Sequence, residues 1–550
     1  MRRFNAPFAL AILASAGLAG CATSSLDMAP DSPDHAWQPR TDATGAIVPG
    51  ASSAAHASTV SGASGVASAS SPANASPAVS ASTLASATTR NTTLPPNPAL
   101  AAVPPPPAFD PAHQYGLAEL IDLAESANPL TRIAWNDARN AALAAGIAKS
   151  AYLPQLSAAA MGQYAGAHGS SSASLDGLPS ADSSSSVSGH GETSVIALNW
   201  LLFDFGGRAA RVEAASQASV IANIGFTAVH QQVIFDVSTA FYAYQAARAR
   251  IDTTRQGLDN AEAILAAAQS RYQHGVGTVI EVAQANQNRA QAKLALVQAE
   301  GAQSNGYLAL IGAMGISPLS KPAIAPLPEH SLPVAMNDSI EQIVSSAIAR
   351  RPDVLSAYAA ERVNFAKVKA AESEFMPKVF MTASGAYHTG SSSISAVPAI
   401  GQQLPTVNLS GGHYGGSVIV GVTIPLYDGG LRSAVLAQAR NDADSATTRL
   451  AHSREDAVRQ IVTAQNALQT SLSAHAAAKE LLAAAQTTYD AAFDAYRHGV
   501  GSVTDALLAQ NQLLAARNAD ADSYSGALSA AAALALATGS VDSIPETGGW

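Results

Sequence analysis

The chain has 550 residues, of which 48% are hydrophobic, 13% are charged and 5% are aromatic. Charged residues make up about a quarter of an average soluble domain, so this composition is unusual for a soluble enzyme. The formal net charge of −10 also argues against a nucleic-acid-binding protein, because such proteins carry a basic surface.

The first 20 residues have the features of a secretory signal peptide. Arg2 and Arg3 precede a short apolar run at 8–18, and small residues lead to Cys21, the single cysteine. The sequence Leu-Ala-Gly-Cys resembles a bacterial lipobox, which implies cleavage before Cys21 and acylation of its side chain. Ala22 follows instead of aspartate, which favours the outer membrane over the inner one.

Residues 21–111 are rich in Ser, Ala, Thr, Pro and Gly and contain few large apolar side chains. Such a segment cannot bury enough surface to offset the loss of chain entropy on folding. The composition predicts a disordered tether, which ends after the proline run at 104–107.

Helical and β-like patterns alternate from residue 112 onward. Residues 115–152 predict a helix that is interrupted at Pro129. Two β-like stretches follow, at about 156–165 and 194–203, and they flank a Ser/Gly-rich segment that we interpret as a loop.

Two long helices joined by a tight turn are predicted next. A helical pattern runs from Gly206 to about Gln273, and ~65 residues at 1.5 Å each would span roughly 100 Å. A return helix is expected from Thr278 to about Leu310. The turn between them contains Gly-Val-Gly, and glycine commonly ends helices because it adopts positive φ at little cost.

The same order of elements recurs in the second half of the chain. The turn sequence Tyr-Gln-His-Gly-Val-Gly-Thr at 272–278 returns as Tyr-Arg-His-Gly-Val-Gly-Ser at 496–502. Motifs upstream recur at a constant spacing, which indicates an internal duplication. The predicted organisation is a signal peptide at 1–20, a tether at 21–111, repeats at 112–312 and 337–540, a proline-rich linker at 313–336 and a tail at 541–550.

Large side chains recur every seven positions along the long helices, with small side chains between them. A sustained seven-residue repeat predicts antiparallel coiled-coil hairpins with a left-handed supercoil. The large positions are Val237, Tyr244, Ile251, Leu258, Leu265 and Tyr272 in the first half, and Ile461, Leu468, His475, Leu482, Tyr489 and Tyr496 in the second.

The β-like stretches alternate apolar and polar residues over about ten positions, as strands of membrane barrels do. A buried β-sandwich face would show the same pattern, but the lipoprotein signal and the polar flanking loops favour the membrane. Four strands cannot close a barrel, and open edges are not tolerated in a bilayer, so we expect an oligomer. The apolar positions are Leu156, Ala158, Ala160 and Tyr164; Ile196, Leu198, Trp200 and Leu202; Val379, Met381, Ala383 and Tyr387; and Val418, Val420, Val422, Ile424 and Leu426.

Together these features resemble the TolC-like outer-membrane factors, in their lipoprotein branch. The resemblance rests on Tyr152-Leu153-Pro154, Trp200 to Gly207, residues 424–430 and the paired glycine turns, and it covers about 112–540. It implies a mostly α-helical fold with a membrane β-barrel contribution: a homotrimer with a 12-stranded barrel in the outer membrane and a periplasmic α-helical barrel closed at its tip.

The resemblance also implies a function. The protein would be the exit duct of a tripartite efflux or type I secretion system, and its partners would be a periplasmic adaptor and an inner-membrane pump. No enzyme activity, cofactor, metal or nucleic acid is expected. The alternative is a coiled-coil lipoprotein that spans the periplasm without a pore, but this reading leaves the four alternating stretches unexplained.

The resemblance places a ring of acidic residues at the narrowest point, just after the second glycine turn. Asp505 occupies that position, Glu281 matches it in the first half, and Arg497 is the candidate for a cation that holds the tip closed. Charged rings set selectivity in pores. The alternative is that Asp505 and Glu281 only cap their helices through Ser502 and Thr278.

The tips of the two turns are the candidate adaptor contacts. Exposed apolar side chains at a hairpin tip suit docking to a partner, whereas turn geometry alone explains the glycines. The candidate residues are Gly275, Val276, Gly277, Gly499, Val500 and Gly501.

Overall fold

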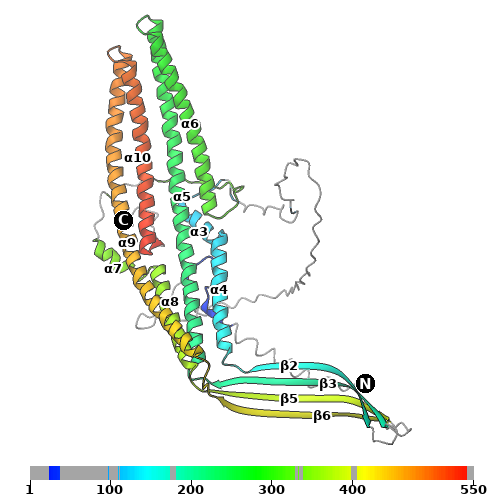
Figure 1. Ribbon diagram of the computed structural model, residues 1–550. Coiled ribbons are helices and arrows are strands. Elements are labelled where there is room, and N and C mark those ends of the chain that lie inside the picture. Colours follow the sequence, from blue (N-terminus) through cyan, green and yellow to red (C-terminus); the bar gives the residue numbers. More distant parts are fainter. Residues whose placement is uncertain are drawn as a thin grey trace.

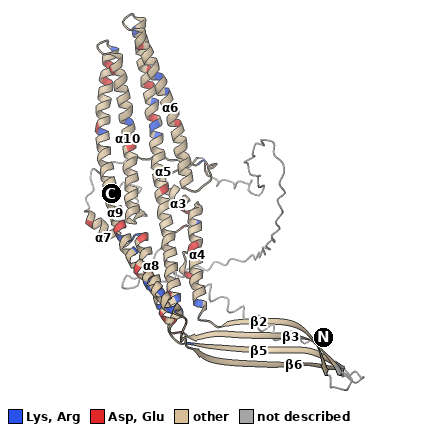
Figure 2. Cartoon of the chain, in the orientation of Figure 1, with Lys and Arg blue, Asp and Glu red and all other residues tan. Residues whose placement is uncertain are grey.

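The computed structural model describes residues 24–37, 97, 109–110, 112–173, 181–328, 332–333, 339–397 and 406–541. The molecule is elongated, with helical hairpins at one end and a four-stranded sheet at the other (Figure 1). Figure 2 shows that the charged residues gather on the helices, whereas the strands are almost free of them. Within the described ranges, no helix combines the length and the apolar character that a membrane span requires.

The first helices begin where the sequence predicts them. Helix α3 (Leu117–Ala127) and helix α4 (Pro129–Ser150) are separated at Asn128. Proline is tolerated in the first turn of a helix, where its missing N–H has no partner to lose. The Asn128 side chain accepts the N–H of Leu130 at 2.9 Å and so caps α4.

Four long helices form two hairpins, as predicted. Helices α5 and α9 each have 67 residues, which corresponds to about 100 Å at 1.5 Å per residue. Each is followed by a return helix of 35 or 36 residues after a short turn. The bounds are α5 Gly207–Gln273, α6 Val279–Ala313, α7 Ile340–Ala347, α8 Pro352–Ser373, α9 Leu431–Arg497 and α10 Val503–Thr538.

The predicted seam of large residues is correct for α9 but only partly correct for α5. In α5, Val237 and Tyr244 are buried, and so are Ala261 and Ala268, which were predicted as small seam residues, whereas Tyr272 near the tip is 50% exposed. In α9 the large positions Leu468, Tyr489 and Tyr496 stay buried within apolar clusters.

The sheet has the antiparallel order β2-β3-β5-β6. Its strands are β2 (Gln155–Ala173), β3 (Ala181–Phe203), β5 (Lys378–Val397) and β6 (Val407–Thr423). With 17 to 23 residues they are about twice as long as predicted, because they continue through Ser/Gly-rich sequence that we had interpreted as loop. Pairing with a neighbouring strand overrides the weak strand propensity of these residues.

The last strand ends earlier than predicted. Ile424 and Leu426 were expected to continue the apolar face of β6, but they lie beyond its end at Thr423. Pro425 has no N–H for the ladder, and proline is confined to the ends and edges of strands. In the first half, the matching position is Leu201, and β3 continues to Phe203.

The register brings the predicted apolar positions of the four strands onto one face. Leu156 lies opposite Leu198, Leu198 opposite Ala383, and Ala383 opposite Val418. Directly opposed residues point to the same side of a sheet. We call this face the apolar band; it consists of Leu156, Ala158, Ala160, Ile196, Leu198, Trp200, Met381, Ala383, Val418, Val420 and Val422.

Aromatic residues bound the apolar band. Tyr387 packs against Tyr414 at the outer end, with ring centroids 4.7 Å apart, and Trp200 lies near the helical end. From Val422 to Tyr414 the band is about 27 Å long at 3.4 Å per residue. Strands of membrane barrels tilt by about 35–45°, so this length corresponds to about 20 Å along the barrel axis, which approaches their apolar band of about 25 Å.

Arg208 joins the sheet to the first long helix. Its guanidinium donates to the carbonyl oxygens of Leu201 at 2.5 Å and Leu202 at 3.0 Å, at the end of β3. It also lies 3.4 Å from the Asp204 carboxylate and 5.0 Å from the Tyr152 ring centre. Because Arg208 and Asp204 are both buried, this junction fixes the direction in which α5 leaves the sheet.

The predicted tether needs correction near its start, because residues 24–37 pack on α4 and α5. Asn223 donates to the Met28 carbonyl oxygen at 2.6 Å, and Thr227 donates to the Trp37 carbonyl oxygen at 2.8 Å. Met28 and Trp37 are the large apolar side chains that such docking requires, and they stand out in an otherwise small and polar segment.

Replacing Arg208 tests the junction. We expect Arg208→Met to lower the free energy of unfolding by about 3–5 kcal/mol, because Asp204 would stay buried without its cation. Arg440→Met is the control, since Arg440 forms an exposed pair with Glu372 at 3.3 Å and should change stability by less than about 1 kcal/mol. Denaturant unfolding of the detergent-solubilised chain measures both, and equal losses would contradict the role of Arg208.

Neighbouring substitutions on β6 test the apolar band. Arginine in place of Val420 should destabilise the protein in lipid bilayers by about 2–4 kcal/mol if this side chain faces the hydrocarbon. Ile419→Arg places the same charge one position along, on the opposite face, and should cost much less. The free energy of unfolding of each variant in lipid vesicles tests this difference. A similar loss of stability in both variants would contradict the assignment of the two faces.

Candidate functional site

The two hairpins end in turns of the same geometry. Gly275 and Gly499 have φ values of 78° and 82°, a region that glycine enters without strain. In the first turn the N–H groups of Val276 and Gly277 both donate to the Arg271 carbonyl oxygen at 3.0 Å. The second turn repeats this with Val500, Gly501 and the Ala495 carbonyl oxygen, also at 3.0 Å.

Both turns present apolar side chains to solvent. Val276 is 66% exposed and Val500 is 83% exposed. Val279 and Ile280 enlarge the exposed apolar surface of the first tip, whereas Val503 on the second tip is buried. The two tips are therefore similar in backbone but differ in surface, and the first offers the larger apolar patch.

The predicted helix caps are present after each turn. Thr278 accepts the N–H of Glu281 at 3.2 Å, and Ser502 accepts the N–H of Asp505 at 3.1 Å. The Ser502 hydroxyl also donates to the Asp505 carboxylate at 2.7 Å. In the single chain, Asp505 is exposed and, among the described residues, forms side-chain hydrogen bonds only with its cap residue Ser502. Glu281 also contacts the second hairpin.

Glu281 connects the first hairpin to the second. Its carboxylate accepts a hydrogen bond from the Tyr496 hydroxyl at 3.2 Å and lies 3.7 Å from the Arg271 guanidinium. Arg271 also donates to the Tyr496 carbonyl oxygen at 3.2 Å, and its guanidinium lies 5.1 Å from the centre of the Tyr496 ring. We call Arg271, Glu281 and Tyr496 the tip link, because they hold the end of α9 against the ends of α5 and α6.

Burial controls the chemistry of the tip link. Tyr496 is 1% exposed. This burial raises the pKa of its phenol to about 12, and the neighbouring Glu281 carboxylate acts in the same direction. The hydroxyl therefore stays a neutral donor across the physiological range, and the bond to Glu281 would be lost only as the pH rises from about 10 toward 12.

Arg497 does not take part in the tip link. It lies 4.0 Å from Asp494 and 5.8 Å from the centre of the Phe493 ring, on the same helix. The cation that reaches across the hairpins is Arg271, which the sequence analysis missed. The sequence contains a hint of this role. The position that matches Arg271 in the second half is Ala495, so the two turns carry arginine at different positions.

A buried polar contact lies below the tips. Asn288 on α6 donates to the Gln510 side chain at 2.7 Å, and Gln510 on α10 donates to the Gly257 carbonyl oxygen at 2.8 Å. Buried amides need partners, so this chain of bonds fixes the relative positions of three helices. The same three helices also carry a buried apolar cluster, which includes Ile264, Ala268, Ala285, Val503, Ala506 and Leu513.

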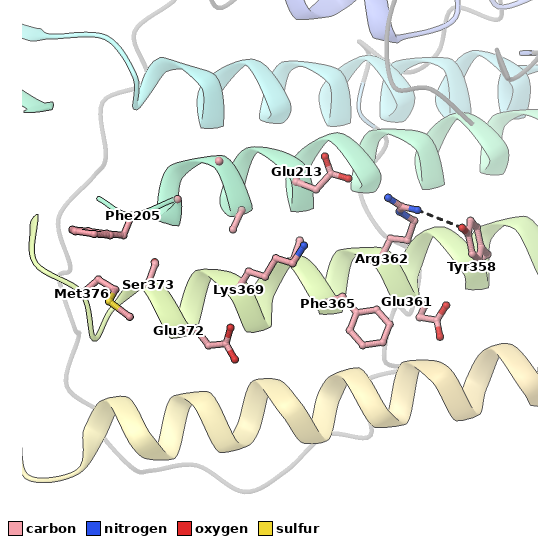
Figure 3. A pocket seen from close by; sticks show the side chains of 14 residues that line it. Phe205, Glu213, Tyr358, Glu361, Arg362, Phe365, Lys369, Glu372, Ser373 and Met376 are labelled. Carbon is pink, nitrogen blue, oxygen red and sulfur yellow. Dashed lines mark hydrogen bonds between the residues drawn. The ribbon is translucent and has the colours of Figure 1, made fainter. Parts of the chain in front are cut away.

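A groove lies between α5 and α8 beside the sheet junction (Figure 3). It has a volume of about 1010 Å³. Glu213, Arg362 and Lys369 give it charges of both signs, and Phe365 adds an exposed aromatic ring. Arg362 donates to the Tyr358 hydroxyl at 3.4 Å, a contact that raises the pKa of the guanidinium. The mixed lining suits a protein surface better than a small-molecule site.

The predicted lipidation site, Cys21, lies outside the described residues. The described chain begins at Ser24, with a short 3-10 helix at Ser24–Met28. Lys149 at the end of α4 contacts the sulfur of Met28 at 3.7 Å.

Comparison with known proteins agrees with this arrangement. A family model described as outer membrane efflux protein matches residues 120–316 and 343–540. Protein CyaE of Bordetella pertussis is 27% identical over 409 residues, which cover 74% of this chain and 80% of that protein. Outer membrane efflux protein BepC of Brucella suis is 27% identical over 401 residues, which cover 72% of this chain and 78% of that protein.

Solved structures share the fold. The structure of CusC has a TM-score of 0.60 at 20% identity and covers 77% of this chain and 92% of its own. The outer membrane protein VceC of Vibrio cholerae has a TM-score of 0.59 at 19% identity and covers 77% of this chain and 96% of its own. Since the family model matches most of the chain, the protein belongs to the outer membrane efflux protein family and is an outer-membrane channel protein.

Proposed function

We propose that the chain forms the exit duct of a tripartite efflux or type I secretion system. The observation that carries this proposal is the apolar band, which is bounded by aromatic residues as in membrane barrels and leads into helices of about 100 Å. Such helices reach deep into the periplasm from the outer membrane. Substrate would pass through the duct from an inner-membrane pump and a periplasmic adaptor, without any covalent step.

The duct is a homotrimer in this proposal. Strands β2 and β6 are the outer strands of the sheet, and each has a single partner within the described chain. Because the four strands alternate in direction, β6 of one copy can pair antiparallel with β2 of the next. Three copies would close a 12-stranded barrel in the outer membrane, with the helical hairpins forming a periplasmic α-helical barrel below it.

Each copy is internally duplicated in this proposal, with repeats at 112–312 and 337–540 and a linker at 313–336. Paired helices of 67 residues in both halves support it. In the linker, β4 (Ala323–Ile324) pairs with β1 (Gln114–Tyr115), and Gln245 donates to the Ala325 carbonyl oxygen at 2.6 Å. These contacts hold the linker against the first half.

The groove at the sheet junction supports the same assembly. We assign it to the contact between adjacent copies, where another helix would cover Phe365 and pair with Glu361 or Lys369. Phe205 at the rim is 52% exposed and has a φ of 51°, which costs energy for a bulky residue. Burial against a neighbouring copy would offset part of that cost.

The hairpin tips form the periplasmic aperture in this proposal. Asp505 is free to face the passage, because its bond to Ser502 uses one carboxylate oxygen. Glu281 is engaged in the tip link and acts by holding the second hairpin against the first. The exposed tips at Gly275–Gly277 and Gly499–Gly501 would contact the adaptor, and acylated Cys21 would anchor the chain in the outer membrane.

Removing one hydroxyl tests whether the tip link keeps the aperture closed. Tyr496→Phe keeps the buried ring but loses the bond to Glu281, so we expect the conductance of the purified protein in planar bilayers to rise several-fold. Tyr489→Phe is the matched control, because Tyr489 is a buried tyrosine one heptad earlier on the same helix. A rise of equal size in both variants would show that the tip link does not control closure.

A charge variant tests the duct itself. The unaltered protein should conduct weakly, and Asp505→Ala should raise its conductance or change its cation selectivity, since charged rings set selectivity. Asp494→Ala is the control, because Asp494 is exposed on the α9 side of the same turn. Absence of conductance in the parent and in Asp505→Ala and Tyr496→Phe would favour a non-conducting coiled-coil lipoprotein instead.

A further inference from the structure

Two histidines face each other on adjacent strands of the sheet. His388 on β5 lies directly opposite His413 on β6, and their rings stack with centroids 5.0 Å apart. They follow Tyr387 and precede Tyr414, which lie on the face of the apolar band. Successive strand residues alternate in direction, so the histidine pair lies on the opposite face, just beyond the height of the band.

A third strand orients one of the two rings. Thr193 on β3 is the direct partner of His388, and its hydroxyl lies 2.9 Å from His388 Nδ1. When Nδ1 carries the proton and donates it to this hydroxyl, Nε2 is left with a free lone pair. A histidine that binds a metal usually has its other nitrogen held in this way, which fixes both the tautomer and the ring direction.

The spacing of the pair suits a single cation. Directly opposed residues in an antiparallel pair have Cβ atoms about 4.5–5.5 Å apart, so two imidazoles can converge on one ion. Imidazole nitrogens bind Zn²⁺ at about 2.0–2.1 Å and also suit Cu²⁺ and Ni²⁺. Small rotations of the stacked rings would direct one nitrogen of each toward a shared ion.

The surroundings leave the remaining coordination positions open. A hollow of about 800 Å³ includes Gln163, Thr193, His388 and His413 in its lining. In the part of the chain that the structure describes, no group of three or more His, Cys, Asp or Glu side chains is arranged around one metal position. An ion at the histidine pair would therefore keep water ligands, and it would exchange more readily than one in a closed structural site.

We propose that His388 and His413 bind one divalent transition-metal ion of the Cu²⁺, Ni²⁺ or Zn²⁺ class, with Thr193 as the positioning residue. Metal binding requires only residues on three strands of one chain. Its placement on the wall of the passage rests on the proposed function, because only a closed barrel turns this face inward.

Copper titration of the purified, detergent-solubilised full chain tests the proposal. Electron paramagnetic resonance should show Cu²⁺ with two imidazole nitrogens at the first bound equivalent. His388→Asn and His413→Asn should each reduce this to one nitrogen and weaken binding at least tenfold in calorimetry. Thr193→Val should keep both nitrogens and weaken binding by about tenfold, the lower end of the loss seen when such partners are removed.

His190→Asn is the matched control. His190 lies on β3, on the opposite face, and contacts the Ser391 hydroxyl at 3.1 Å. It should leave the first copper equivalent unchanged, and circular dichroism should confirm that every variant remains folded. Unchanged affinity and nitrogen count in both His388→Asn and His413→Asn, or no copper binding by the parent at millimolar concentration, would overturn the proposal. Because the readout needs no conductance, a failed duct and a failed metal site give different results.

Discussion

The outer edges of β2 and β6, which have no strand partner among the described residues, are the constraint on which the rest of the structure depends. In a bilayer each unsatisfied backbone group costs several kcal/mol, so a sheet with two free edges cannot remain there alone. The apolar band suits a lipid environment, whereas unpaired strand edges are not tolerated in lipid. Other copies would therefore have to pair with β2 and β6. In the proposed trimer, this closure would arrange the long hairpins in a ring and bring their tips together at the far end of the molecule.

The strands and the junction are held mainly by hydrogen bonds to the backbone, whereas polar side chains and a buried apolar cluster join the ends of the hairpins. The strands are held by continuous ladders of up to 19 paired residues, and Arg208 ties β3 to α5 through several buried contacts. The tip link, in contrast, consists of side-chain contacts: Tyr496 donates to Glu281, Arg271 donates to the Tyr496 carbonyl oxygen, and Arg271 forms a partly buried ion pair with Glu281.

Features that depend on neighbouring residues in the chain were predictable from the sequence. Helix bounds, the break at Pro129 and the caps at Thr278 and Ser502 depend on local signals, and the structure confirms them. The apolar face was predictable for the same reason, since alternation is a property of each strand. The extension of β2 and β3 through serine-rich sequence was not predictable, because it depends on pairing between strands.

In the candidate site, too, local features were predictable and long-range contacts were not. The positions of the tip residues followed from the two glycine turns, but the contact between Arg271 and Tyr496 joins residues that are far apart in the chain. The histidine pair on β5 and β6 is also a long-range contact. The docking of Met28 and Trp37 is another, although these large apolar side chains stand out in a small and polar segment. Asp505 as an aperture residue and the adaptor contacts remain predictions.

The number of chains in the particle tests the account most directly, since everything depends on closing the free strand edges. Native mass spectrometry of the full-length protein released from detergent micelles gives this number. The account predicts three copies in a particle that retains its strand content by circular dichroism. A folded particle of one copy that keeps the same sheet and inserts into lipid would contradict it.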